Sequence, residues 1–235
     1  MTLQEFLPLQ TFHFLLVFCR VGSAFVLMPG IGETFVPPRA RLALGLLISL
    51  LLVPLLNLPP MPSSPGALLP LIAHEVILGL FFGAMGRILL LALDTAGNIA
   101  GQQLGLGNAM LFNPTMAQQG AILGVFLGIC GVMVVLAAGL HTLLIHTLKD
   151  SYQAFPPGGA LPTEDMASYF SKLTSHSLLL AVQLSAPFLV MGLVFNVGLG
   201  LLSRLMPQLQ AYFVATSLQT ALGLALLMLV AGAIL

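Results

Sequence analysis

The stretch AGNIAGQQLGLGNAMLFNPTMAQQGAILG, residues 96–124, decides how this chain folds. It lies within residues 95–148, an interval that contains no Asp, Glu, Lys or Arg. Residues four apart share one face of a helix, and glycines there let another helix approach closely. Glycines recur at this spacing on both sides of an amide-rich segment, and the predicted packing positions are Gly97, Gly101, Gly120, Gly124 and Gly128. The sequence therefore predicts close-packed helices around an uncharged segment that tolerates water.

The composition indicates an integral membrane protein. Hydrophobic residues make up 58% of the 235 positions and charged residues 6%, whereas about a quarter of a soluble domain is charged. In lipid each apolar segment has to be helical, because a lone strand would leave its backbone polar groups without partners. We therefore predict an all-α, polytopic fold. The formal net charge is zero and there is no basic block, which excludes nucleic acid as a partner.

Six apolar segments are expected to form the helices. Their lengths are uneven: the second is short, and the fourth is too long for one untilted span of about 20 residues. Segments both shorter and longer than the bilayer thickness favour helices that pack mainly against protein and not against lipid. The segments are Thr11–Met28, Leu42–Leu56, Leu71–Leu93, Ala117–Leu148, Ser177–Leu202 and Leu209–Leu235.

Proline and glycine mark the joins between these segments. PGIGETFVPPR (29–39), NLPPMPSSPG (57–66) and PPGG (156–159) cannot continue a helix, so each is predicted to be a loop. Thr163, followed by two acidic residues, is predicted to start a short polar helix. A tight turn at 204–207 would join the last two segments as a hairpin. With no soluble domain and no internal repeat, residues 1–235 are expected to form one domain.

Patterns for catalysis or metal binding are missing. His74-Glu75 would need a second histidine at position 78 for a zinc-protease helix, and Leu78 stands there. His141 and His146 lie about 140° apart around a helix, which places them poorly for sharing a metal. There is no serine elbow, phosphate loop or pair of intramembrane carboxylates. We expect no catalytic residue, no metal and no cofactor, and therefore not an enzyme.

Arginines interrupt the apolar runs. Arg20 and Arg87 lie inside such runs, where a charge costs several kcal/mol unless it reaches water or pairs. Contacts between subunits and anchoring within the chain both stay open for them, as for Arg41 and Arg204. Arg20 is a candidate to pair with a carboxylate of a neighbouring subunit, whereas Glu75 fits an interfacial position.

The centre of the opening stretch is a candidate plug. Its glycines permit open backbone, its proline limits helix, and its Met, Leu and Phe supply pliable apolar bulk. Such a loop could fill a lumen, although an ordinary packed turn is the alternative. The candidate residues are Gly105, Leu106, Gly107, Asn108, Ala109, Met110, Leu111, Phe112 and Asn113.

Three ordered blocks resemble the FliR family of the flagellar type III export gate. The first runs over residues 18–54, the second is TAGNIAGQQLGLGNAMLFNP at 95–114, and the third runs over 186–219. Asn113 stands where the family has Asp, and Asn108 where it commonly has an aromatic residue. The other matching positions are Arg20, Pro29, Pro38, Arg41, Pro54, Pro187, Asn196, Leu199–Leu202, Arg204 and Pro207–Leu209.

The resemblance implies a subunit assembled with FliP and FliQ homologues, and with FlhB and FlhA homologues nearby, in the bacterial inner membrane. Its helical hairpins would form a FliP-like half joined to a FliQ-like half. Residues 105–113 would plug a lumen through which unfolded flagellar proteins pass. An injectisome export component is the alternative. A small-molecule transporter or a membrane-embedded enzyme is more remote, because mid-span acids, an inverted repeat and clustered catalytic residues are not found.

Overall fold

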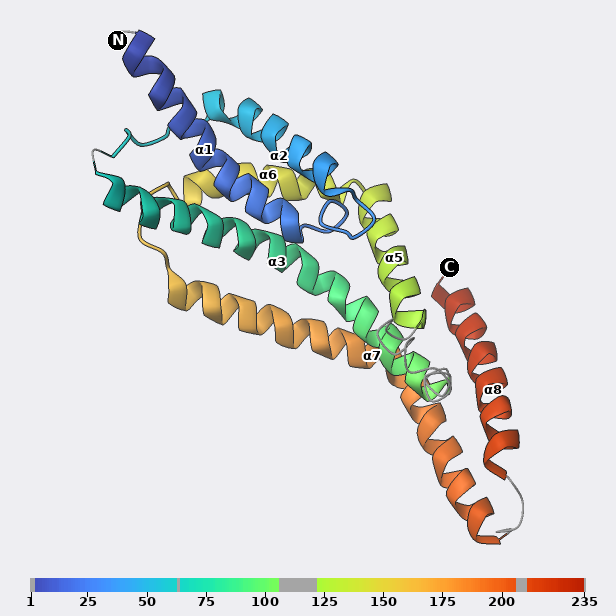
Figure 1. Cartoon of the computed structure of the whole chain (residues 1–235). Helices are drawn as coiled ribbons and strands as arrows, with labels where there is room; N and C mark the ends of the chain where they lie inside the picture. The colour runs from blue at the N-terminus through green and yellow to red at the C-terminus, as the bar shows by residue number, and fades with distance from the viewer. Residues whose placement is uncertain (1–2, 63, 106–121, 206–210, 235) are drawn as a thin grey trace. The chain divides into compact units, whose positions relative to one another are not determined.

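The structure, a computed structural model, describes residues 3–62, 64–105, 122–205 and 211–234. Within these ranges the chain is helical and has no strand, which confirms the all-α prediction. Figure 1 shows the order of the helices along the chain. Their bounds are α1 (Leu3–Leu27), α2 (Pro38–Leu52), the 3-10 turn η1 (Val53–Leu55), α3 (Pro65–Gln103), α5 (Ile122–Ala137), α6 (Leu140–Ala154), α7 (Thr163–Leu205) and α8 (Ala211–Ile234).

Four of the described helices are long and apolar enough to cross a membrane, or five spans if the bent pair α5 and α6 counts as one. That pair breaks between Ala137 and Leu140 with a bend of 72°. Gly139 stands at the break with φ 70°, a left-handed conformation that glycine adopts without strain. The overlong fourth segment is thus a broken helix in its described part. The arrangement of six segments as hairpins stays a prediction, because the turn before α8 lies outside the described residues.

The predicted short polar helix at Thr163 is wrong in its length. α7 does begin at Thr163, but it continues through the polar residues into the apolar segment as one helix of 43 residues. Residues 163–186 contain neither proline nor glycine, so nothing in the backbone interrupts the hydrogen-bond ladder there. The polar stretch is therefore the first part of a long apolar helix and not a separate element.

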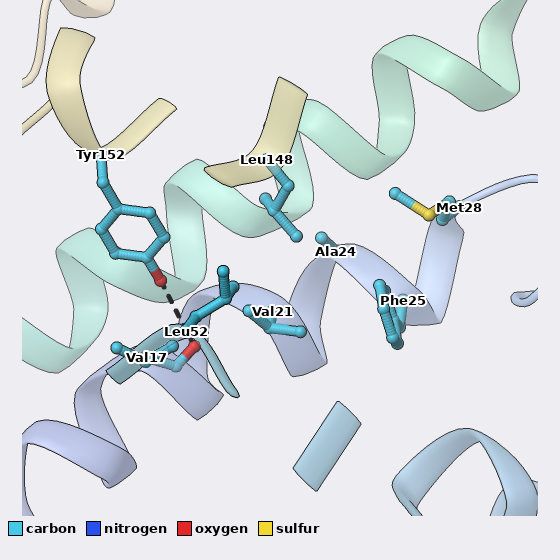
Figure 2. Close-up of a cluster of buried hydrophobic side chains, with 8 residues drawn as sticks. All are labelled: Val17, Val21, Ala24, Phe25, Met28, Leu52, Leu148 and Tyr152. Carbon is cyan, nitrogen blue, oxygen red and sulfur yellow. Dashed lines mark hydrogen bonds between the residues drawn. The ribbon is translucent and has the colours of Figure 1, made fainter. Parts of the chain in front are cut away.

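The chain divides into two compact units, and the divisions fall inside α3, α5 and α7. The first unit comprises Met1–Leu90 and Val132–Thr174. Its helices α1, α2 and α6 join in one apolar core, against which Phe82 of α3 also packs. Figure 2 shows this core, in which the Tyr152 hydroxyl of α6 donates to the backbone oxygen of Val17 in α1 at 3.4 Å. The core residues are Val17, Val21, Ala24, Phe25, Met28, Leu52, Leu148 and Tyr152.

The second unit comprises Leu91–Gly131 and Ser175–Leu235. Ala92 and Ala96 of α3 pack on Ala181 of α7 in a cluster of small side chains. A second cluster lies around the end of α3 and contains Ala100, Leu104, Leu123 and Phe188. Leu226 and Leu227 of α8 pack against it. The last turn of α3 therefore lies in the core of this unit.

Candidate functional site: a buried arginine cluster and the end of helix α3

Arg20 is completely buried in the first unit and pairs with Glu75, which is also completely buried. Its Nε donates to Glu75 Oε2 at 2.7 Å, and its Nη2 donates to Glu75 Oε1 at 2.9 Å. This is the two-pronged arrangement in which a guanidinium and a carboxylate bind most strongly. The carboxylate partner expected in a neighbouring subunit is thus found in the same chain, 55 residues away. Glu75 is correspondingly a core residue and not an interfacial one.

Other groups complete this cluster. Arg20 Nη1 donates to the Ser151 hydroxyl at 3.2 Å, and Nη2 donates to the backbone oxygen of Phe155 at 2.9 Å. The guanidinium carbon lies 3.9 Å from the centre of the Tyr152 ring, a cation–π distance. His74 Nδ1 lies 3.2 Å from Glu75 Oε1. One arginine of α1 is therefore bonded to α3, to α6 and to the residue that follows α6.

Two further arginines organise the loop between α1 and α2. Arg41 donates to the backbone oxygens of Ile31 and Glu33 at 3.2 and 2.9 Å. Arg87 of α3 donates to the Glu33 carboxylate at 3.3 Å, with the arginine side chain 34% exposed. Arg41 thus bonds to loop carbonyls outside the helix ladders, whereas Arg87 pairs with a loop carboxylate. Arg204 lies exposed in the last turn of α7.

In the second unit, α3 and α5 meet at two of the predicted packing glycines. A Cβ added at Gly97 would lie 2.5 Å from the Cα of Gly124 and 2.7 Å from the oxygen of Leu123. A Cβ added at Gly124 would lie 2.7 Å from Oδ1 of Asn98. Only glycine fits where two backbones approach this closely. At Gly128 a Cβ would make an ordinary contact of 3.9 Å with Asp94.

The other packing glycines are less fully described. Gly101 is buried in the last part of α3. Gly120 lies outside the described residues. Of the candidate plug, only Gly105 lies within them, and Leu106 to Asn113 do not.

The end of α3, directly before the candidate plug, is a site that the sequence did not reveal. Gly105 has φ 73°, and its N–H donates to the oxygen of Gln102 at 3.1 Å, as at many helix ends that terminate in a left-handed glycine. Gln219 Nε2 donates to the backbone oxygen of Gln103 at 2.7 Å, and the Thr220 hydroxyl donates to that of Leu104 at 3.0 Å. In the sequence this site is marked by the polar pair Gln219-Thr220 inside the apolar α8, but that pair does not indicate which residues it would hydrogen-bond.

Metal binding finds no support in the part of the chain that the structure describes, since no three His, Cys, Asp or Glu side chains gather there. The buried Arg20 and Gln219 instead join helices to one another. Together with the apolar helices, these contacts define the class of the protein: a multi-pass helical membrane protein with helices joined by buried polar groups.

Comparison with known proteins gives the family. Residues 11–235 match the model of the bacterial export proteins, family 1. Over 222 residues the chain is 40% identical to the flagellar biosynthetic protein FliR of Caulobacter vibrioides, covering 94% of this chain and 88% of that protein. It is 30% identical over 227 residues to the Yop proteins translocation protein T of Yersinia pestis, covering 94% and 86%. The flagellar biosynthetic protein FliR of Bacillus subtilis is 26% identical over 217 residues, covering 91% and 84%.

The chain belongs to this family of bacterial export proteins, the FliR family. Membership makes it a component of a type III export apparatus. The family consists of export components and not of known enzymes.

Proposed function

We propose that the chain is the FliR-type core subunit of a flagellar export gate in the bacterial inner membrane. In this proposal it assembles with FliP and FliQ homologues, with FlhB and FlhA homologues adjacent, around a conduit for unfolded flagellar proteins. The observation that carries the proposal is 40% identity to a flagellar FliR protein over 94% of the chain. The apolar helices agree with a place in a membrane assembly.

The injectisome remains the second candidate because of one observation. The chain is 30% identical to the Yop proteins translocation protein T of Yersinia pestis, above the 26% found for the FliR protein of Bacillus subtilis. Both systems would need the same kind of gate, so the distinction concerns the exported proteins and not the chemistry.

Deleting the gene in its native host separates the two. We expect cells without the chain to stop exporting flagellar filament protein and to lose swimming, with recovery when the intact chain is supplied from a plasmid. Normal flagella combined with loss of another secreted protein set would assign the chain to an injectisome. Normal secretion of both kinds would contradict an export function.

Within the gate, we propose that residues 105–113 form the plug. The supporting observations are the charge-free composition of this segment and the left-handed Gly105 at which the chain leaves α3. A constriction of pliable apolar groups resists ions but deforms around a polypeptide. Deleting residues 107–112 should leave an assembled complex with raised ion conductance at rest. Unchanged conductance in the assembled deletion complex would contradict the plug.

A further inference from the structure

The last turn of α3 receives side-chain hydrogen bonds from a helix 116 residues further along the chain. The donors, Gln219 and Thr220, are neighbours on α8, and their acceptors, the backbone oxygens of Gln103 and Leu104, are neighbours at the end of α3. We call this pair of hydrogen bonds the α8 clasp. Because the acceptors are backbone atoms, the clasp fixes the path of the main chain and not merely a side chain.

The clasp supplies donors to two carbonyls at this helix end. A helix leaves its last four carbonyls without partners in its own ladder. The N–H groups of Leu104 and Gly105 donate within the turn, to the backbone oxygens of Ala100 and Gln102 at 2.9 and 3.1 Å. Gln103 and Leu104 then obtain their donors from α8. In a protein core or at membrane depth such carbonyls cannot rely on water, so their loss would carry a penalty.

Close packing holds the clasp in place. Leu104 is completely buried and Gln219 is 8% exposed. Gly223 of α8 lies against the end of the Leu104 side chain, and Gly192 of α7 lies against the end of the Gln103 side chain, so an added Cβ at either glycine would displace that side chain. Gly223 is one helical turn after Gln219, on the same face of α8. Two helices therefore meet the last turn of α3 at glycines, which sets it within a close-fitting core.

We infer that Gln219 and Thr220 are positioning residues that set the direction in which the chain leaves α3 at Gly105. This inference deepens the proposed function, because the segment that begins at Gly105 is the proposed plug. The clasp consists of neutral hydrogen bonds, each of which contributes modestly and reversibly. Such bonds hold the end of α3 at a modest cost of breaking them, whereas a buried ion pair could not be broken so readily.

The test uses the whole assembled complex and two variants that preserve side-chain shape. Gln219→Met removes the amide at similar length, and Thr220→Val removes the hydroxyl at equal volume. Gln153→Met and Thr174→Val are the matched controls, because Gln153 is exposed on α6 and the Thr174 hydroxyl donates within its own helix, to Phe170. Thr220→Ser keeps the donor and serves as the rescue variant.

Hydrogen exchange measures the clasp itself. We expect the Leu104 and Gly105 amides to exchange about threefold to tenfold faster for each bond lost, with wild-type rates in the controls and in Thr220→Ser. Wild-type exchange in the Gln219→Met, Thr220→Val double variant would overturn the clasp. This readout does not depend on whether residues 105–113 plug a lumen.

Ion conductance measures its role in the gate. In potassium-loaded membrane vesicles we expect the double variant to leak severalfold more than wild type, with FliP and FliQ homologues still co-purifying. In a chain lacking residues 107–112 the two substitutions should add no further leak. Faster exchange with wild-type conductance would overturn the positioning role while leaving the plug in place. No leak from the deletion alone would instead overturn the proposed plug.

Discussion

The two compact units of this chain differ in the polar groups that join their helices. In the first unit a buried arginine bonds to a buried carboxylate, a hydroxyl and a carbonyl, and lies over a tyrosine ring. In the second unit the interhelix hydrogen bonds at the end of α3 are neutral, because an amide and a hydroxyl donate to carbonyl oxygens. Close glycine packing occurs in both units, since an added Cβ would meet the backbone of Ala24 at Gly83 in the first and of Gly124 at Gly97 in the second. The buried ion pair is therefore what distinguishes the first unit.

The difference teaches how unequally polar contacts contribute to the stability of one membrane chain. Removing one partner of a buried ion pair costs about 3–5 kcal/mol, because the other charge is left buried. A neutral hydrogen bond contributes only about 0.5–1.5 kcal/mol. Losing one of these hydrogen bonds in the second unit is therefore expected to cost far less than losing one partner of the ion pair in the first.

The largest expected effect comes from breaking the ion pair on one side. Glu75→Leu should lower the free energy of unfolding by about 3–5 kcal/mol, because Arg20 keeps its charge and loses its carboxylate. Denaturant unfolding of the detergent-solubilised protein measures this. The double variant Arg20→Met, Glu75→Leu should recover most of the loss, since no charge is left buried. A free energy of unfolding of Glu75→Leu within about 1 kcal/mol of the wild-type value would contradict the importance given to the buried ion pair.

Glycine packing in the second unit should give the next largest effect. Gly97→Leu forces α3 away from α5 at the point where even a Cβ would meet the Gly124 backbone. We expect a loss of about 1–3 kcal/mol and a lower yield of assembled complex, measured by size-exclusion chromatography. Gly128→Ala is the control, because its Cβ would make only ordinary contact. Equal yields from the two variants would argue against close packing at Gly97.

The smallest effect is expected at the loop between α1 and α2. Arg87→Gln removes a pair with Glu33 whose arginine side chain is 34% exposed. A pair with this access to solvent contributes less than about 1 kcal/mol, and salt should weaken it further. The unfolding midpoints of variant and wild type, compared at low and high salt, provide the measurement. If Arg87→Gln lowered the stability as much as Glu75→Leu, burial would not explain why the two ion pairs differ in strength.

Composition and backbone breakers predicted much of the fold. The scarcity of charge required helices, and the proline-rich loops before α2 and α3 lie close to their predicted positions. Lengths were harder to predict, because polarity alone does not end a helix. Residues 163–176 are rich in polar side chains, yet α7 runs through them without a break.

Contacts between distant residues could not be read from the sequence. Glu75 lies near the start of its apolar segment, where an interfacial position was the simpler interpretation, and nothing local connects it to Arg20. The α8 clasp joins residues 116 positions apart, and in the sequence it is marked only by an ordinary Gln-Thr pair. The Gly97 and Gly124 positions were predictable as packing surfaces because their spacing repeats along a helix. Periodic features could thus be predicted from the sequence, whereas single long-range pairs required the structure.

The central claim is that this chain works as one subunit of an export gate. The most direct test is to purify the tagged full chain from native membranes under mild detergent and to identify by mass spectrometry what accompanies it. We predict a single complex that contains the FliP and FliQ homologues of the same cell. A chain recovered alone, from membranes in which those homologues are present, would contradict the proposal.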